Sequence, residues 1–200
     1  MELNPNIRYN FYYWGPYLWR TKIDLKICDE ILNRGRILTS SFTDNLASLI
    51  DDVKHFNNKD DQDYITRCLD PYFDCYLETK KDFATINNVP NLKLLDIWIN
   101  FQKKGEYNPE HIHRGDLSFV LYLGIPEGLY EENKRFKGAG AGPGCIVFRY
   151  GEQSDWAVSL HKFIPEKGDL FIFPSLLSHS ANVFKSDGIR VSVSGNFEFI

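Results

Sequence analysis

Two histidines stand two residues apart in the run Glu110–Asp116, and a third, His179, lies far downstream. Side chains two residues apart on an extended segment point to the same side, so His111 and His113 can share one ion. The apolar run Leu117–Leu123 that follows predicts a buried strand, which places the pair at a strand mouth. His179 follows a second strand-like run and a turn at a proline. Three imidazoles with open coordination positions suit a redox-active divalent metal such as iron.

A histidine taken at random is more often a hydrogen-bonded core or surface residue than a metal ligand. We interpret two of the five histidines in this way. His55 lies among charged residues in a segment of helical pattern, and His161 lies in an alternating strand pattern. The close pair and a downstream arginine favour metal binding for the other three histidines.

That arginine begins the last predicted strand, where Arg190, Ser192 and Ser194 share one face and two valines occupy the other. Burying an arginine inside a β-barrel is costly unless its charge meets an anion. Its planar fork of donors suits a carboxylate. The alternative is a surface arginine on an edge strand whose serines face water.

These residues together resemble the iron(II)- and 2-oxoglutarate-dependent oxygenases, whose fold is a double-stranded β-helix, or jelly roll. The resemblance implies that the three histidines hold iron(II), with dioxygen taking an open position. It also implies that the distal carboxylate of 2-oxoglutarate is held by Arg190, Ser192 and Tyr122. The segment Gly105–Pro109 is similar to the approach strand of prolyl-hydroxylase-like members. The resemblance covers Leu92–Ile200 and is strongest to a little-characterised branch encoded by bacteria and phages.

One position departs from the family pattern, because most members have Asp or Glu where this chain has His113. Either the site uses three histidines, or Asp116 bends back to supply the carboxylate of a facial triad. The spacing favours three histidines, since Gly115 breaks the strand between His113 and Asp116.

The resemblance implies a dioxygenase that hydroxylates an unactivated C–H bond of a peptidyl or small-molecule substrate and releases succinate and CO2. The competing interpretation is a non-catalytic, cupin-like β-barrel that binds a metal or a small ligand. Arg190 argues against it, because a cupin has no need for Arg-x-Ser shortly after its last histidine.

Composition limits the remaining function classes. A chain of 200 residues suits one domain, and a net charge of −4 without a dense basic cluster argues against binding duplex nucleic acid. Four cysteines without C-x-x-C spacing predict reduced thiols. No run is apolar enough to span a membrane and no signal peptide is evident, so we expect a cytoplasmic protein.

The chain changes character near Leu92, which predicts an α+β fold: a jelly-roll core over 92–200 with helices from 1–91 packed on one side. Helical patterns cover three stretches: Leu25–Leu32, a stretch from Ser41 or Thr43 through Val53, and Asp61–Phe83, which Pro71 should kink or split.

Two further segments carry expectations of their own. The glycine-rich run Gly138–Gly144 lacks the Lys-Ser/Thr of a phosphate loop, so we predict a mobile loop at the mouth of the site, together with Leu129–Lys137. The aromatic run Tyr9–Trp19 predicts a strand or arm that seals the core.

Overall fold

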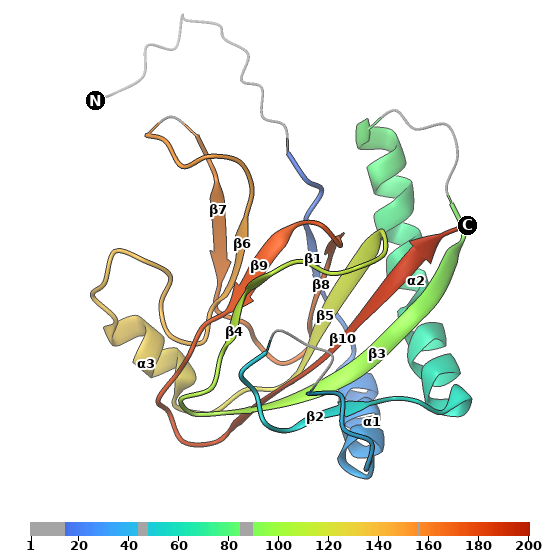
Figure 1. The fold of residues 1–200 in the computed structure, drawn as a ribbon, viewed down its shortest axis with the longest axis horizontal. Coiled ribbons are helices and arrows are strands. Elements are labelled where there is room, and N and C mark those ends of the chain that lie inside the picture. The colour runs from blue at the N-terminus through green and yellow to red at the C-terminus, as the bar shows by residue number, and fades with distance from the viewer. Residues whose placement is uncertain (1–14, 44–47, 85–89, 156) are drawn as a thin grey trace, which may run out of the picture.

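The protein is described by a computed structural model that covers residues 15–43, 48–84, 90–155 and 157–200. Two antiparallel sheets form its core, with helices on the outside (Figure 1). In the part described, the larger sheet has six strands in the order β1-β8-β5-β10-β3-β2, and the smaller has four in the order β4-β9-β6-β7. This arrangement is the predicted jelly-roll core with helices on one side.

The strands of the larger sheet come from both halves of the chain: β1 (Trp19–Lys22), β2 (Val53–His55), β3 (Leu92–Lys103), β5 (Leu117–Gly124), β8 (Asp169–Pro174) and β10 (Ile189–Phe199). The smaller sheet is built only from strands of the second half of the chain: β4 (Asn108–His111), β6 (Ile146–Arg149), β7 (Leu160–Phe163) and β9 (Ser178–Ala181). The helices are α1 (Leu25–Arg36), α2 (Lys59–Ala84) and α3 (Leu129–Arg135).

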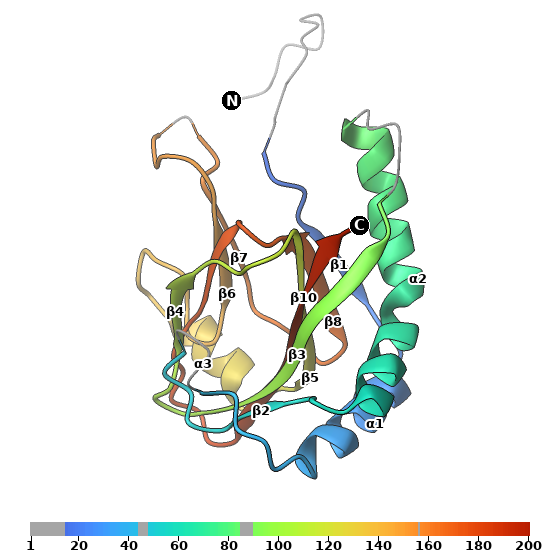
Figure 2. The same ribbon diagram turned by 45° about the vertical axis from the view of Figure 1, so that its right-hand side comes forward.

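Helices α1 and α2 cover the outer face of the larger sheet (Figure 2). The Asp24 side chain caps α1 by accepting a 2.8 Å hydrogen bond from the backbone N–H of Lys26. Apolar side chains of both helices join those of β3, β5, β8 and β10 in one buried cluster. Both helices lie where the sequence predicted them, and α2 is not split at Pro71.

The helix predicted between Ser41 and Val53 is wrong. Residues 44–47 lie outside the described part of the chain, but Leu49 forms a β-bridge with Tyr107 and Val53 begins β2. Pairing of β2 with β3 satisfies backbone groups and buries Val53, and this tertiary pairing outweighs the local helical pattern. His55 therefore lies on a strand.

The alternation predicted for the last strand is confirmed in β10. Val191 and Val193 face the helices in the larger cluster, whereas Arg190, Ser192 and Ser194 face a cavity between the sheets. The two faces of one strand thus serve different purposes: one anchors the fold and the other presents polar groups inward.

The segments at the periphery give mixed outcomes. Residues Tyr9–Trp14 of the predicted sealing arm lie outside the described residues, whereas Trp19–Lys22 pairs with β8 as strand β1. The stretch predicted as part of a mobile loop contains helix α3, which the sequence did not predict. Among the described residues, no helix is long and apolar enough to cross a membrane.

Candidate functional site

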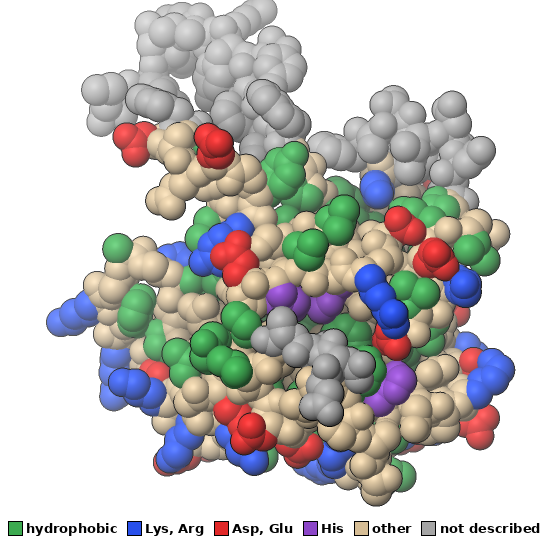
Figure 3. Space-filling view, viewed as in Figure 1, with side chains coloured by type: hydrophobic (Ala, Val, Ile, Leu, Met, Phe, Trp, Pro, Cys, Tyr) green, Lys and Arg blue, Asp and Glu red, His purple; other side chains and the backbone are tan. Residues whose placement is uncertain are grey.

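Pairing of β4 with β9 brings the three predicted histidines together. His111 and His179 are opposite one another in the register of the two strands. His113 follows the end of β4, where its backbone N–H donates to the carbonyl of Ser175 at 2.9 Å. One nitrogen from each ring lies within 4.8 Å of the others. In the space-filling view, histidine surface is visible near the centre of the molecule (Figure 3).

Backbone carbonyls fix the protonation of two of these rings. Nδ1 of His111 lies 2.7 Å from the carbonyl of Pro109, and Nδ1 of His179 lies 2.9 Å from the carbonyl of Leu177. A carbonyl only accepts, so each Nδ1 carries the proton and each Nε2 is unprotonated and can act as an acceptor or a metal ligand. Carbonyl partners of this kind are typical of metal-binding histidines.

Burial keeps the cluster uncharged. It lowers the pKa of His113 to about 2 and that of His179 to about 3, and each ring is further disfavoured as a cation by its histidine neighbours. The pKa of His111 is also lowered by burial. All three rings are therefore neutral at physiological pH, the form that binds a metal.

The alternative ligand Asp116 is turned away from the cluster. Its carboxylate accepts a 2.8 Å hydrogen bond from the backbone N–H of Phe199, near the end of β10. Its backbone is also fixed, because its N–H donates to Phe197 and its carbonyl accepts from Ser175. Asp116 thus ties two strands together, and the residue beside the other two histidines is His113.

A second group of polar side chains lies across strands β5, β10 and β3. Ser192 is opposite Tyr122 on one side and Asn100 on the other, and Arg190 is opposite Gln102. Burial raises the pKa of Tyr122 to about 12, so its phenol is a neutral hydrogen-bond donor at physiological pH. The guanidinium carbon of Arg190 lies 5.8 Å from the ring centre of Tyr122.

Arg190 is only 2% exposed, and burial lowers the pKa of its guanidinium. Its hydrogen-bond partners are the carbonyl of Gly144 and the side-chain oxygen of Gln102, both uncharged. In the described part of the chain no carboxylate is paired with it. The arginine thus remains a buried cation that an anion can stabilise.

One cavity of about 110 Å³ joins the two groups, and we call it the histidine cavity. It is lined at one end by the three histidines and at the other by Tyr122, Arg190 and Ser192. All six predicted site residues therefore border the same cavity.

The sequence did not identify several residues of this cavity. Trp98, Asn100 and Gln102 line it from alternate positions of β3, and Asn108 lines it beside His111. The side-chain oxygen atoms of Asn100 and Asn108 are buried and have no hydrogen-bond partner among the described residues. The signal was present in the sequence, because Asn100 and Gln102 are polar residues at a spacing of two in the otherwise apolar stretch 97–102.

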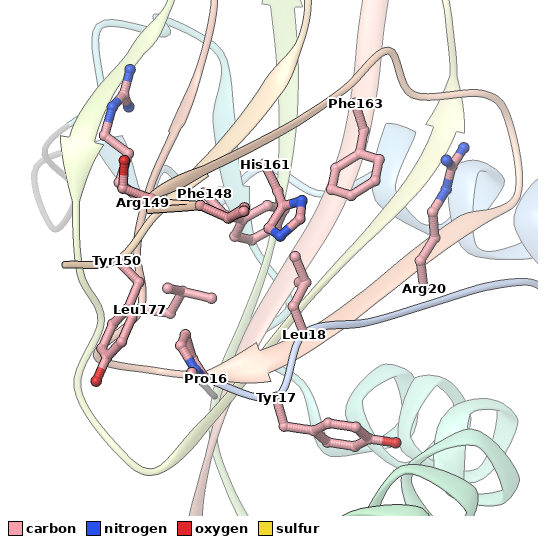
Figure 4. A pocket seen from close by; sticks show the side chains of 13 residues that line it. Pro16, Tyr17, Leu18, Arg20, Phe148, Arg149, Tyr150, His161, Phe163 and Leu177 are labelled. Carbon is pink, nitrogen blue, oxygen red and sulfur yellow. The ribbon is translucent and has the colours of Figure 1, made fainter. Parts of the chain in front are cut away.

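A larger cavity of about 250 Å³ lies between β6, β7 and the segment that precedes β1, and we call it the aromatic cavity. Phe148, Phe163, Leu18, Leu177 and His161 line it (Figure 4). Its Arg20 is bound to Asp169 at 2.8 Å. It shows none of the clustered metal ligands that mark the histidine cavity among the described residues.

Comparison with known proteins agrees with this geometry. Residues 96–196, half of the chain, match the family model of a putative 2OG-Fe(II) oxygenase. The chain belongs to this oxygenase family. Fe(II) and 2-oxoglutarate are thus its metal and its cosubstrate, with dioxygen as the oxidant. No curated protein matches the sequence of this oxygenase.

Solved structures with the same fold include a viral collagen prolyl hydroxylase from Paramecium bursaria Chlorella virus-1 in complex with 2-oxoglutarate. It is 16% identical with a TM-score of 0.58, covering 92% of this chain and 96% of the viral one. A prolyl-4-hydroxylase from Pseudomonas putida is 14% identical with a TM-score of 0.54, covering 90% and 91%. HygX from Streptomyces hygroscopicus, solved with nickel, 2-oxoglutarate and hygromycin B, is 10% identical with a TM-score of 0.56, covering 90% and 82%. At these identities the likeness establishes the fold.

The histidine cluster of this oxygenase fits an iron ion. Nε2 of His113 and Nε2 of His179 lie 3.1 Å apart. Two imidazole nitrogens bound at right angles to one metal at about 2.1 Å would lie about 3 Å apart. The spacing of this pair and the unprotonated Nε2 atoms of His111 and His179 favour a shared ion, and one ligand nitrogen from each of the three rings lies within 4.8 Å of the others.

Proposed function

We propose that this oxygenase hydroxylates an unactivated C–H bond of a peptidyl or small-molecule substrate. The observation that carries the proposal is the single cavity that has three neutral imidazoles at one end and an unpaired buried cation at the other. 2-Oxoglutarate needs both of these groups, because its keto acid chelates the metal and its distal carboxylate needs a cation. The family match favours this function over a non-catalytic, cupin-like binding barrel.

At the metal end, we infer that His111, His113 and His179 hold iron(II) through Nε2. The carbonyls behind His111 and His179 fix these rings in the ligating tautomer. The ring of His113 packs against Trp98, with ring centres 5.4 Å apart, which limits its rotation. Bound iron(II) and 2-oxoglutarate supply the oxidising chemistry: one oxygen atom of O2 enters the substrate and the other enters succinate, as CO2 is released.

At the opposite end, we infer that Arg190 binds the distal carboxylate of 2-oxoglutarate. Its fork of donors matches a carboxylate, and the neighbouring hydroxyls of Ser192 and Tyr122 can donate to the same group. Because the three side chains come from adjacent strands in fixed register, the anion site exists before the cosubstrate arrives.

A further cavity of about 380 Å³ supports the proposed class of substrate. It shares Trp98, Ile112 and His113 with the histidine cavity. We call it the outer cavity. Phe42 and Trp98 give it an aromatic wall, and an ion pair between Asp96 and Arg114 gives it a charged rim. Such a mixture suits a substrate with an apolar reacting carbon and polar flanks, as in a peptide or a small polar metabolite.

The test is a turnover assay with purified protein, Fe(II), ascorbate, 2-oxoglutarate and 18O2, run against a peptide library and a panel of small metabolites. We expect succinate formation in wild type and one labelled oxygen atom in one class of substrate. Arg190→Ala, which leaves the histidines intact, serves as the matched control and should form almost no succinate. If the iron-loaded wild type neither binds 2-oxoglutarate nor forms succinate, the cupin-like alternative becomes the better interpretation.

A further inference from the structure

Gln102 is the side chain that holds the guanidinium of Arg190. The two residues are opposite each other in the pairing of β3 with β10, and each is 2% exposed. The side-chain oxygen of Gln102 accepts a hydrogen bond from Nη2 of Arg190, while Nη1 donates to the carbonyl of Gly144. The fork of the arginine is thereby held on two sides.

The orientation of the Gln102 amide follows from its other contacts. Its Nε2 lies 2.7 Å from the carbonyl of Glu106 and 3.4 Å from the carbonyl of Asn182. Because carbonyls only accept hydrogen bonds, the NH2 group must face them and the oxygen must face Arg190. Gln102 thus connects the arginine to the two loops that carry Glu106 and Asn182. These contacts fix the orientation of its side-chain amide.

The choice of an amide at this position has an electrostatic consequence. Glutamate has nearly the same shape as glutamine, and it would form a buried ion pair with Arg190 at the same place. An amide supplies the hydrogen bond but leaves the positive charge uncompensated. The charge is then available for an anion that enters the histidine cavity.

We propose that Gln102 is a positioning residue that makes this oxygenase selective for a 2-oxo acid with a second, distal carboxylate. The proposal rests on the proposed function, in which Arg190 binds that carboxylate. Glutamate in place of Gln102 would lose the hydrogen bonds to the carbonyls of Glu106 and Asn182, as any residue without the NH2 group would. Its internal ion pair with Arg190 would in addition compete with the distal carboxylate of the ligand. Binding of the keto acid end at the histidines, on the other side of the cavity, would be retained.

The experiment compares two ligands, 2-oxoglutarate and 2-oxopentanoate, which has the same chain length without the distal carboxylate. Calorimetry with the Mn(II)-loaded protein measures both affinities without turnover. In wild type we expect 2-oxoglutarate to bind at least ~30-fold more tightly, as expected for a buried charge pair. In Gln102→Glu this preference should fall to within ~3-fold, because 2-oxoglutarate loses affinity and 2-oxopentanoate does not.

Gln102→Met is the matched control, because it removes the hydrogen bonds and adds no charge. This variant should bind 2-oxoglutarate more weakly than wild type does, yet keep part of the preference for 2-oxoglutarate over 2-oxopentanoate. A Gln102→Glu protein that keeps the full preference would overturn the proposal, as would a Gln102→Met protein that loses as much preference as Gln102→Glu. Should Gln102→Glu fail to fold, full retention of affinity and preference in Gln102→Met would overturn it, and partial loss would support it. Failure of wild type to bind 2-oxoglutarate at all would instead contradict the proposed function.

Discussion

The histidine cavity and the aromatic cavity lie in the same fold, but their polar side chains are partnered differently. In the aromatic cavity, Arg20 is bound to Asp169 and its guanidinium lies 5.4 Å from the centres of two phenylalanine rings. In the histidine cavity, Arg190 has only neutral partners, and two asparagine oxygens have none among the described residues. The aromatic cavity is more than twice as large, at about 250 Å³ against about 110 Å³. Unsatisfied polar groups therefore mark the functional cavity better than volume does.

The comparison predicts that histidine substitutions have the largest effect on metal binding. Alanine at His111, His113 or His179 should weaken Fe(II) binding by more than about 100-fold, since even the outer partners of metal ligands are worth about 10–100-fold. The fold should survive, because these side chains belong to neither large apolar cluster. Calorimetric titration with Fe(II) under argon measures the effect.

Asp116→Ala is the control for this series, because the Asp116 carboxylate bonds to the backbone of Phe199 instead of facing the histidines. It should bind iron as wild type does. Normal iron binding by His113→Ala together with loss in Asp116→Ala would restore the carboxylate alternative.

The next largest effect is expected at Arg190, on the cosubstrate. Arg190→Ala should cost about 2–5 kcal/mol of 2-oxoglutarate binding, since a desolvated carboxylate is left without its partner. Lysine supplies the charge without the two-pronged geometry, so Arg190→Lys should retain weak binding and weak turnover. Binding is measured by calorimetry and turnover by succinate release. Wild-type affinity in Arg190→Ala would mean that the anion site lies elsewhere.

A smaller effect, on stability alone, is expected when the ion pair between Arg20 of the aromatic cavity and Asp169 is removed. Burial by itself would raise the pKa of Asp169, but hydrogen bonds from Arg20, the backbone N–H of Glu166 and Lys22 outweigh burial and lower it. Asp169→Asn should reduce the free energy of unfolding at pH 7 by about 1–3 kcal/mol. Affinity for 2-oxoglutarate should not change, because the carboxylate is already used within the fold.

The pH dependence of that effect has a definite sign. A carboxylate with a lowered pKa in the folded state stabilises the protein above its unfolded pKa of about 3.9, and this contribution is lost as the pH falls through the folded pKa. Wild type and Asp169→Asn should therefore differ at pH 7 and converge below about pH 4 in urea unfolding. A constant difference at all pH values would contradict the role given to this ion pair.

The sequence indicated which side chains share one cavity better than it predicted some of the elements around them. The three histidines and Arg190 could be singled out because period-two spacing and strand ends are local signals. Gln102 and Asn100 were missed because their importance depends on the strand that pairs opposite them, and pairing is not a local property. The carbonyl of Gly144 has no sequence signal, since every residue has a carbonyl.

The errors in the fold have the same origin. The helix predicted before Val53 had a local pattern, but pairing of β2 with β3 decided the structure. Helix α3 was overlooked because its seven residues offer too short a pattern to distinguish from a loop. The division into one domain, the cytoplasmic location and the absence of duplex nucleic acid binding stay predictions.

The most direct test of the account is an anaerobic titration of the Fe(II)-loaded protein with 2-oxoglutarate, followed in the visible spectrum. Chelation of the metal by the keto acid produces a metal-to-ligand charge-transfer band. In wild type we predict a band that saturates at one equivalent of 2-oxoglutarate. In Arg190→Ala the band should need a higher concentration of 2-oxoglutarate, and in His179→Ala it should be absent. A wild-type protein that binds both iron and 2-oxoglutarate without the band, or a full band in His179→Ala, would contradict the claim that one cavity unites the histidines and the arginine around a single cosubstrate.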